Sequence, residues 1–550
     1  MKLELKPSHR IPVSPGPLLL VVLDGVGVGL KDDGDATFLA RTPVLDALTG
    51  SSAYRLIRAH GTSVGLPSDD DMGNSEVGHN AMGAGRIYDQ GARLVNKAIA
   101  TGDIFRSPGW ESIRKRCLGH GGALHLIGLL SDGNVHSHET HLHAILRQAD
   151  REGFREVYVH ALLDGRDVAE TSALLYLERL ESVLAEGNAK ADRRYRIASG
   201  GGRMTTTMDR YENDWGMVLR GWKAQVYGEG RAFASAREAV ETFRSETPGL
   251  IDQYLPVFVV AEGGKPVAPM KDGDCVILYN YRGDRALEVS RAFDAGPDFD
   301  KFDRGPVPEL FFAGMTLYDG EYHIPRTHLV APPRIERTVS EHLASTGVTQ
   351  YVVSETQKFG HMTYFWNGNR GGMFDPRTET YEEIASDSVP FDQRPWMKAA
   401  EIADAADTAL RSGKYRFLRL NFANGDMVGH TGKLLPTVVA LEAMDLALAR
   451  ILAAVRATRG TLVVTADHGN AEDMVERDKA GVPLRNQDGS MKGKTAHTTN
   501  PVGFWIHRPL GPRLTLRKDL PDAGLANVAS TLVELLGYAP PEEYLPSMLG

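Results

Sequence analysis

Residues 18–25 read LLLVVLDG, an uninterrupted apolar run that ends at Asp24 and Gly25. Consecutive leucine and valine residues without polar alternation are typical of a strand covered on both faces, as in parallel sheets. Lys2 and Lys6 precede this run, but it is too short for most signal peptides and lacks a small-residue cleavage site. We therefore predict a buried β-strand with an aspartate at its carboxyl end.

Similar apolar runs recur along the chain and alternate with helical patterns. They lie at residues 124–130, 157–163, 276–279, 351–353, 417–422 and 461–465. Residues 435–454 place apolar side chains at three- and four-residue spacing, which predicts an amphipathic helix. This alternation indicates an α/β fold with largely parallel sheets.

Three acidic residues follow three of the predicted strands, namely Asp24, Asp426 and Asp467. Ligands of open α/β sheets bind beyond the carboxyl ends of the strands, so these carboxylates are expected to converge. A chain of 550 residues also exceeds what one hydrophobic core usually serves. We predict a discontinuous domain of residues 1–89 and 326–550, with residues 90–325 as an inserted second domain whose far border is proline-rich.

Composition excludes several functional classes. The chain is 42% apolar and 24% charged, as an ordinary globular protein is. A net charge of −9 offers no basic face to nucleic acid. Cys117 and Cys275 are the only cysteines and lack CxxC spacing, which argues against a disulfide framework and favours a cytoplasmic location. No apolar segment is long enough to cross a membrane.

One serine lies in a stretch of small and polar residues, MGNSEVGHN at 72–80. Polar clusters follow much later, as NGDMVGH at 424–430, TADHGN at 465–470 and TAHTTN at 495–500. A serine that takes up a phosphoryl group needs its alkoxide stabilised, which divalent metals held by aspartate and histidine can do. Together these motifs predict a metal-dependent phosphoryl-transfer enzyme in which Ser75 is the nucleophile.

The metal ligands fall into two candidate sets. Asp426 and His430 are four residues apart, so one helical turn places them on the same face, and His497 offers a third ligand. The second set is Asp24, Ser75, Asp467 and His468. Such mixed donors suit manganese, zinc, cobalt or magnesium, and the sequence does not choose among them. The alternative is that these residues are solvated loop side chains.

A histidine-rich stretch, HSHETHLH at 136–143, also resembles a metal site. It is not HExxH, because His138 and His141 are only three residues apart. We interpret most of these histidines as helix caps and packing residues. His136, in the turn around Gly133 and Asn134, is the exception that we assign to a functional site.

Seven further segments match a known family in order along nearly the whole chain. They are DG at 24–25, DMGNSEVGHN at 71–80, LSDGNVHSH at 130–138, LDGRD at 163–167, MDR at 208–210, NYRGDR at 280–285 and SETQK at 354–358. With the clusters at Asp426, Asp467 and His497, the chain resembles the 2,3-bisphosphoglycerate-independent phosphoglycerate mutases of the alkaline phosphatase superfamily. That family has a phosphatase-like metal-binding domain with an inserted, substrate-binding transferase domain.

The resemblance implies interconversion of 3-phosphoglycerate and 2-phosphoglycerate in glycolysis and gluconeogenesis, without 2,3-bisphosphoglycerate. Ser75 is expected to form a phosphoserine, and Lys358 to approach the phosphate. Two divalent ions are implied, manganese first, with cobalt, magnesium or zinc as alternatives. One ion is expected on Asp24, Ser75, Asp467 and His468, and the other on Asp426, His430 and His497.

The inserted domain is expected to bind glycerate, because arginine forks match a carboxylate in two places. By resemblance the pocket consists of His136, Arg166, Arg203, Arg210, Arg282 and Arg285. Asp167 is implied as a general acid/base, or alternatively as an acceptor that orients a neighbour. The stretch GGGRMTTTMDRY at 200–211 resembles the longer variant of plants and trypanosomatids, which implies a monomer.

Two other classes of protein compete with the mutase. A phosphatase, sulfatase or phosphopentomutase shares the two-metal core, but the arginines of RGDR at 282–285 and DGRD at 164–167 favour the mutase. A non-catalytic scaffold would be marked by loss of Ser75 or of a metal ligand, and all are present.

Overall fold

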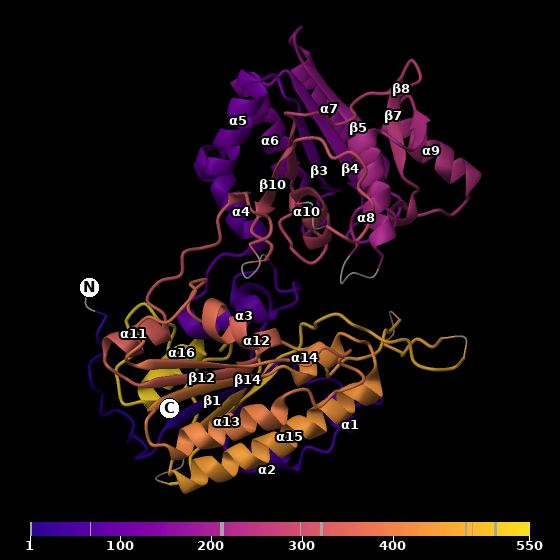
Figure 1. The fold of residues 1–550 in the computed structure, drawn as a ribbon. Coiled ribbons are helices and arrows are strands. Elements are labelled where there is room, and N and C mark those ends of the chain that lie inside the picture. Colours follow the sequence, from indigo (N-terminus) through magenta and orange to yellow (C-terminus); the bar gives the residue numbers. More distant parts are fainter. Residues whose placement is uncertain are drawn as a thin grey trace. The chain divides into compact units, whose positions relative to one another are not determined.

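The computed structural model of the chain describes residues 3–66, 68–209, 214–296, 299–319, 323–478, 481–486, 488–510 and 514–550. The chain forms two compact units, each with its own sheet (Figure 1). Unit 1 comprises Met1–Gln90 and Pro333–Gly550, and unit 2 comprises Gly91–Pro332. Arg210, one of the arginines assigned to the substrate, lies outside the described residues.

The apolar run 18–23 forms the strand β1 (Leu18–Leu23) inside the sheet of unit 1, and each of its residues is buried. Leu18 pairs with Phe417 on one side and with Thr461 on the other, both in parallel register. The strand order is β13 (Glu379–Ile384), β12 (Gln350–Glu355), β14 (Phe417–Phe422), β1, β15 (Thr461–Thr465), β16 (Val502–His507) and β2 (Ala53–Ile57). The first five are parallel, and β16 runs antiparallel to both of its neighbours. The α/β prediction is confirmed.

Helices cover both faces of this sheet, as a sheet of doubly buried strands requires (Figure 1). One layer holds α1 (Ala36–Leu39), α2 (Pro43–Ser51), α13 (Ala399–Arg411) and α15 (Leu434–Ala457). The other holds α3 (Ser75–Ala84), α11 (Val339–Ser345), α12 (Thr356–Gly360) and α16 (Asn527–Leu535). The short helix α14 (Asn424–Gly429) joins β14 to α15. The helix predicted at 435–454 is confirmed as α15.

Unit 2 is built around a second, mostly parallel sheet. Its order is β11 (His328–Val330), β10 (Phe311–Thr316), β9 (Cys275–Leu278), β3 (Leu124–Leu130), β4 (Glu156–Leu163), β5 (Arg194–Gly202), β7 (Phe258–Glu262) and β6 (Arg231–Phe233), with β8 (Lys265–Pro266) paired to β7. Because β11 pairs with β10, unit 2 extends to Pro332, several residues beyond the boundary predicted after residue 325.

The helices of unit 2 pack against two hydrophobic clusters. Leu124 and Leu126 of β3 belong to one cluster, whereas Ile127 and Leu129 belong to the other, as the alternation of a strand dictates. The helices are α4 (Gly91–Thr101), α5 (Pro108–Gly119), α6 (Glu139–Glu152), α7 (Ala173–Asn188), α8 (Trp215–Trp222), α9 (Ala236–Glu246) and α10 (Leu287–Asp294). Cys117 and Cys275 are both buried and unbridged. In the described part of the chain, every helix is too short or too polar to span a bilayer.

A buried polar chain crosses the middle of the unit 2 sheet. His125 Nε2 lies 3.3 Å from Asp274 Oδ2, His125 Nδ1 lies 3.0 Å from His160 Nε2, and His160 Nδ1 lies 2.8 Å from Ser199 Oγ. The carboxylate only accepts, so His125 Nε2 donates to Asp274. Burial and the neighbouring His125 hold the pKa of His160 well below its ordinary value.

From the buried His160 we predict that acid destabilises the protein. A histidine whose pKa is lowered by folding binds its proton only in the unfolded state, so stability is lost as the pH falls below about 6.5. Between pH 7.5 and 5.5 the loss from His160 amounts to at most about 1.4 kcal/mol, or roughly 3–6 °C in melting temperature for a unit of this size.

Calorimetry of the full chain in excess EDTA tests this expectation. His160→Gln should be less stable at pH 7.5 but should lose fewer degrees than the wild type on acidification. His120→Gln, at an exposed position, is the matched control and should keep the wild-type slope. An unchanged slope in His160→Gln would contradict the assignment.

Candidate active site

Ser75 is the first residue of α3, whose N-cap Asn74 accepts a hydrogen bond from the Val77 amide. A helix N-terminus presents free N–H groups and a partial positive charge, which favour an anion. Ser75 is 5% exposed, and Gly78, one turn later, packs so closely that a Cβ there would lie 2.6 Å from the Asp467 carbonyl oxygen. The local sequence therefore fixes the serine against the loop that follows β15.

The Ser75 hydroxyl lies at the centre of a buried polar cluster. Lys358 Nζ donates to Ser75 Oγ at 2.6 Å. Ser75 Oγ lies 3.2 Å from Asp24 Oδ1 and 2.9 Å from His468 Nε2. Lys358 also contacts Asp24 Oδ1 at 2.9 Å and Asp426 Oδ2 at 2.8 Å. The structure thus brings the predicted nucleophile, the predicted lysine and three predicted metal ligands together within unit 1.

Neighbouring parallel strands account for this convergence. Asp24 follows β1, Asp467 and His468 follow β15, Asp426 lies in α14 after β14, and Lys358 lies in α12 after β12. These four strands are adjacent in the sheet, so their carboxyl ends lie along one edge. Gly25 has a φ of 69° and approaches Asp426 so closely that a Cβ would lie 2.7 Å from its Cα.

The first predicted ligand set forms a tight triangle. His430 Nε2 lies 3.2 Å and His497 Nε2 lies 3.1 Å from Asp426 Oδ1, and the two Nε2 atoms are 2.9 Å apart. The Nδ1 atoms face backbone carbonyls, at 2.7 Å for His430 and Thr495, and at 2.8 Å for His497 and Gly73. A carbonyl only accepts, so each Nδ1 carries a proton. A ring that carries no second proton offers the Nε2 lone pair to the centre of the triangle.

In the second set, Asp24, Asp467 and His468 offer ligand atoms within 4.8 Å of one another, and Ser75 Oγ lies beside Asp24 and His468. The first three residues have 0% exposure. Asp467 Oδ1 accepts from the backbone N–H groups of Gly25 and His468, whereas its buried Oδ2 makes no well-aligned hydrogen bond to the described residues and lies 3.3 Å from His79 Nδ1. An unsatisfied carboxylate oxygen aimed at other anionic and imidazole groups is a donor set for a cation.

The electrostatics of the cluster favour the charged forms of Lys358 and His468 and the neutral form of His497. Burial opposes the ammonium of Lys358, but Asp24, Asp426 and Asp467 outweigh it and raise its pKa above the ordinary value. Burial likewise opposes the imidazolium of His468, yet Asp467 and Asp426 raise its pKa to about 10. Burial and the charge on His468 lower the pKa of His497 to about 4. The carboxylates of the cluster therefore stabilise positive charge on Lys358 and His468.

Two residues that the sequence analysis did not assign support the ligands. Asn421, at the end of β14, donates to Asp24 Oδ2 at 2.7 Å. His79 Nδ1 lies 2.8 Å from the Ser75 carbonyl oxygen and 3.3 Å from Asp467 Oδ2. Asn421 could have been noticed as a polar residue in an apolar strand, and His79 as a histidine inside the motif that contains Ser75.

The residues predicted in unit 2 also lie at one edge of their sheet. His136 follows β3, Asp167 follows β4, Arg203 follows β5 directly, and Arg282 and Arg285 follow β9. These four strands are adjacent and parallel, with β9 and β3 at one end of the group and β4 and β5 at the other. The backbone N–H groups of Tyr281 and Arg282 donate to the His136 carbonyl oxygen, which joins the two loops.

Side chains of this group pair with aspartates. Arg203, 1% exposed, donates through Nη1 to Asp164 Oδ1 at 2.8 Å and also to Asp167 Oδ2. His136 Nδ1 lies 3.3 Å from Asp284 Oδ1. Burial opposes the charge of Asp284, but Arg282 and His136 hold its pKa well below its ordinary value. Asp164 and Asp284 are thus anchors that the sequence analysis did not assign.

The other two arginines differ in exposure. Arg285 is buried and donates through Nη1 to the Met208 carbonyl oxygen at 2.6 Å, whereas Arg166 is exposed.

The remaining histidines of residues 136–143 include the helix cap that we predicted, because the His138 ring accepts from the Thr140 amide at the start of α6.

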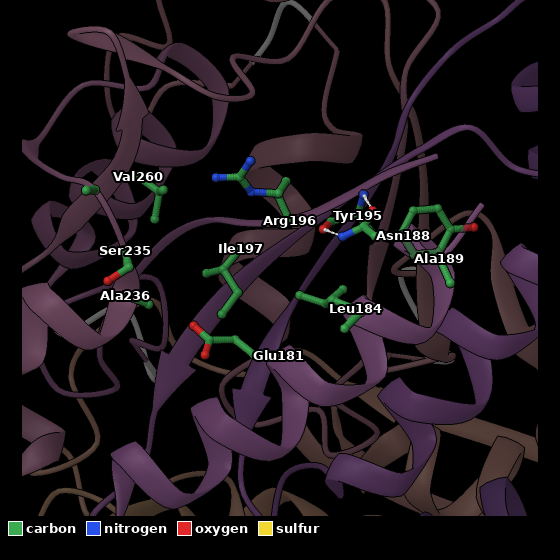
Figure 2. Close-up of a pocket in the computed structure, with 12 residues that line it drawn as sticks. Glu181, Leu184, Asn188, Ala189, Tyr195, Arg196, Ile197, Ser235, Ala236 and Val260 are labelled. Carbon is green, nitrogen blue, oxygen red and sulfur yellow. Dashed lines mark hydrogen bonds between the residues drawn. The ribbon is translucent and has the colours of Figure 1, made fainter. Parts of the chain in front are cut away.

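A separate surface pocket of about 360 Å³ opens in unit 2 between α7, β5 and the start of α9 (Figure 2). Its polar groups include those of Glu181 and Asn188 of α7, Arg196 of β5 and Ser235 before α9. Asn188 is occupied by paired hydrogen bonds to the Tyr195 backbone. The pocket contains none of the residues predicted for the site.

Comparisons with known proteins give a consistent result. A family model described as the Metalloenzyme superfamily matches residues 16–540. The 2,3-bisphosphoglycerate-independent phosphoglycerate mutase of Trypanosoma brucei brucei is 52% identical over 97% of this chain and 97% of its own length. A probable enzyme of the same name from Arabidopsis thaliana is 50% identical, over 96% and 95%. The crystal structure of Leishmania mexicana phosphoglycerate mutase at low cobalt concentration matches with a TM-score of 0.74 and 49% identity over 100% of both chains.

Proposed function

The chain belongs to the family of 2,3-bisphosphoglycerate-independent phosphoglycerate mutases, as its motifs predicted, and we propose how its residues share that reaction. The enzyme interconverts 3-phosphoglycerate and 2-phosphoglycerate, a step of glycolysis and gluconeogenesis. We assign the phosphoryl transfer to unit 1 and the binding of glycerate to unit 2. The observation that carries the proposal is the buried contact of Ser75 Oγ with Lys358, Asp24 and His468.

Ser75 is the proposed nucleophile. The Ser75 hydroxyl gives up its proton as its oxygen attacks phosphorus, the bond between phosphorus and the C3 oxygen of glycerate breaks, and that C3 oxygen takes up a proton. In the second half the C2 hydroxyl loses a proton, its oxygen attacks the phosphoserine, and the Ser75 oxygen that is freed takes a proton back. Lys358, in contact with Ser75 Oγ, is positioned to stabilise negative charge that develops on the phosphate oxygens.

The two ligand sets fit divalent ions. Ligands about 2.1 Å from an ion lie roughly 3.0–3.4 Å apart, and the Asp426, His430 and His497 atoms are 2.9–3.2 Å apart. Two inward lone pairs at 2.9 Å repel one another unless a cation or proton lies between them. We propose that Asp426, His430 and His497 hold one ion. Asp24, Ser75, Asp467 and His468 would hold the other.

When bound, such ions lower the pKa of a coordinated hydroxyl and neutralise phosphate charge. Manganese is the ion we propose first, because carboxylate and imidazole donors together suit it, with cobalt, magnesium or zinc as alternatives. We further propose that the enzyme needs no 2,3-bisphosphoglycerate and acts as a cytoplasmic monomer.

The glycerate carboxylate calls for fixed cationic donors, which unit 2 supplies. Arg203 is held by two aspartates, and Arg282 lies 3.4 Å from Asp284, so both guanidinium groups are oriented before substrate arrives. We propose that these two, with His136, Arg166 and Arg285, bind glycerate, and we extend the proposal to Arg210. Asp167, paired with Arg203, is the proposed general acid/base.

A coupled assay with enolase tests the proposed function and its metal requirement. We expect turnover of 3-phosphoglycerate without 2,3-bisphosphoglycerate, lost in EDTA and restored by manganese. The same protein melted in both buffers serves as the control for folding. Hydrolysis of a generic phosphate ester, with no mutase turnover in any of the four metals, would instead assign a phosphatase.

A further inference from the structure

Glu472 is a buried carboxylate beside the metal-ligand loops that neither the motifs nor the proposed reaction uses. It lies in the segment after β15, five residues beyond Asp467, and is 1% exposed. Both of its oxygens accept two hydrogen bonds each. A buried carboxylate that accepts four hydrogen bonds holds the segments that donate to it in fixed positions.

The four donors come from three separate segments of the chain. Glu472 Oε2 accepts from the backbone N–H groups of Gly27 at 3.0 Å and Asn470 at 2.8 Å. Glu472 Oε1 accepts from Asn500 Nδ2 at 3.0 Å and from the Thr498 hydroxyl. Each segment carries a proposed metal ligand within three residues of the donor.

The ligand on each segment belongs to one of the two proposed sets. Gly27 lies three residues after Asp24, Asn470 lies two residues after His468, and Thr498 directly follows His497. Glu472 therefore connects the second set, through Asp24 and His468, to the first set, through His497.

The surrounding backbone is shaped to admit this side chain. A Cβ at Gly27 would lie 2.4 Å from Glu472 Cδ, and a Cβ at Gly469 would lie 2.2 Å from Glu472 Oε1. The Thr498 amide also donates to the Gly469 carbonyl oxygen at 3.0 Å, which brings the two ligand loops together around the carboxylate. Glycine at both positions is thus explained by the close approach of Glu472.

We propose that Glu472 is a positioning residue that sets the spacing of the two metal-ligand groups and lends them negative potential. The proposal rests on the proposed function, because it assumes that these groups bind divalent ions. All four donors to Glu472 are neutral, so they do not cancel the negative charge of the carboxylate, and that charge attracts a nearby cation. It touches no ligand atom itself and acts through the loops that carry them.

Manganese binding, measured by calorimetry and by electron paramagnetic resonance of the bound ion, tests the proposal in the full chain. Glu472→Gln keeps the shape, but its amide nitrogen cannot accept the hydrogen bonds that one of the two carboxylate oxygens accepted. We expect its affinity for at least one manganese ion to fall by about 10–100-fold, the usual effect of such a supporting group. Glu472→Ala should bind more weakly still.

Glu379→Gln is the matched control. Glu379 is also buried, at 3% exposed, and accepts two backbone N–H groups and the Tyr381 hydroxyl. It lies on β13, an edge strand of the sheet, beside the amino end of β12. We expect this variant to melt at a lower temperature but to bind manganese as the wild type does.

The outcomes distinguish a failure of the role of Glu472 from a failure of the proposed metal sites. Wild-type manganese affinity in folded Glu472→Gln, or equal losses in Glu472→Gln and Glu379→Gln, would overturn the role of Glu472 alone. No manganese binding by the wild type would overturn the metal part of the proposed function. Should Glu472→Gln fail to fold, Thr498→Val removes only one donor to Glu472 and should still weaken manganese binding measurably.

Discussion

Ser75→Ala is expected to abolish mutase turnover, by about 10⁴-fold or more, while the fold stays close to that of the wild type. Excess manganese should still fill both sites, because Asp24, Asp467 and His468 remain as ligands of the ion that Ser75 also contacts. The hydroxyl is the only oxygen of that side chain, so no other atom at position 75 can carry the phosphoryl group. Loss of one hydroxyl from a helix terminus costs little stability compared with loss of a core side chain. The coupled assay with excess manganese measures the first effect, and thermal melting measures the second.

A second readout identifies the intermediate. Wild-type protein quenched in acid during turnover should contain a fraction heavier by one phosphoryl group on the peptide with Ser75, and Ser75→Ala should not. Ser530→Ala removes another buried hydroxyl of unit 1, one that donates to the Leu545 carbonyl oxygen, and should retain activity. Turnover in Ser75→Ala above about 1% of wild type would exclude the phosphoserine route.

Features that depend on local sequence could be predicted. The run 18–23 is apolar on both faces, and such strands usually lie in the interior of a parallel sheet, where helices cover both faces. Parallel strands end at one edge, so Asp24 and Asp467 were expected to meet. The four-residue spacing of Asp426 and His430 requires only one helical turn, and their side chains lie 3.2 Å apart.

Features that depend on contacts between distant segments could not be predicted from local sequence. Asn421 supports Asp24 across 397 residues, and Glu472 reaches Gly27 across 445. The pairing of Arg203 with Asp167 joins two loops whose closeness follows only from the order of β4 and β5. Unit 2 ends at Pro332 rather than at residue 325 because β11 pairs with β10, and a strand of three residues is too short to show a pattern in the sequence.

Lys358→Met is expected to lower turnover by about 10²–10³-fold, the effect of removing one donor that stabilises a developing oxyanion. It should also destabilise the metal-depleted protein by about 3–5 kcal/mol, because buried carboxylates lose their positive partner. Lys358 is 3% exposed and contacts both Asp24 and Asp426. Its raised pKa keeps the ammonium charged, so the stabilisation is present below about pH 10 and is lost only as the pH rises through the folded pKa.

Manganese should restore much of the stability of Lys358→Met but little of its activity, because a cation can neutralise Asp24 and Asp426 without replacing the N–H donors. Melting in EDTA and in manganese therefore separates the two roles of the lysine. Lys398→Met is the matched control, since Lys398 pairs with Asp387 at 2.8 Å nearer the surface and should cost about 1 kcal/mol or less. If Lys358→Met melted like the wild type in EDTA, the charge balance that we assign to this lysine would be wrong. The carboxylates of Asp24, Asp426 and Asp467 would then have to be neutralised by protons.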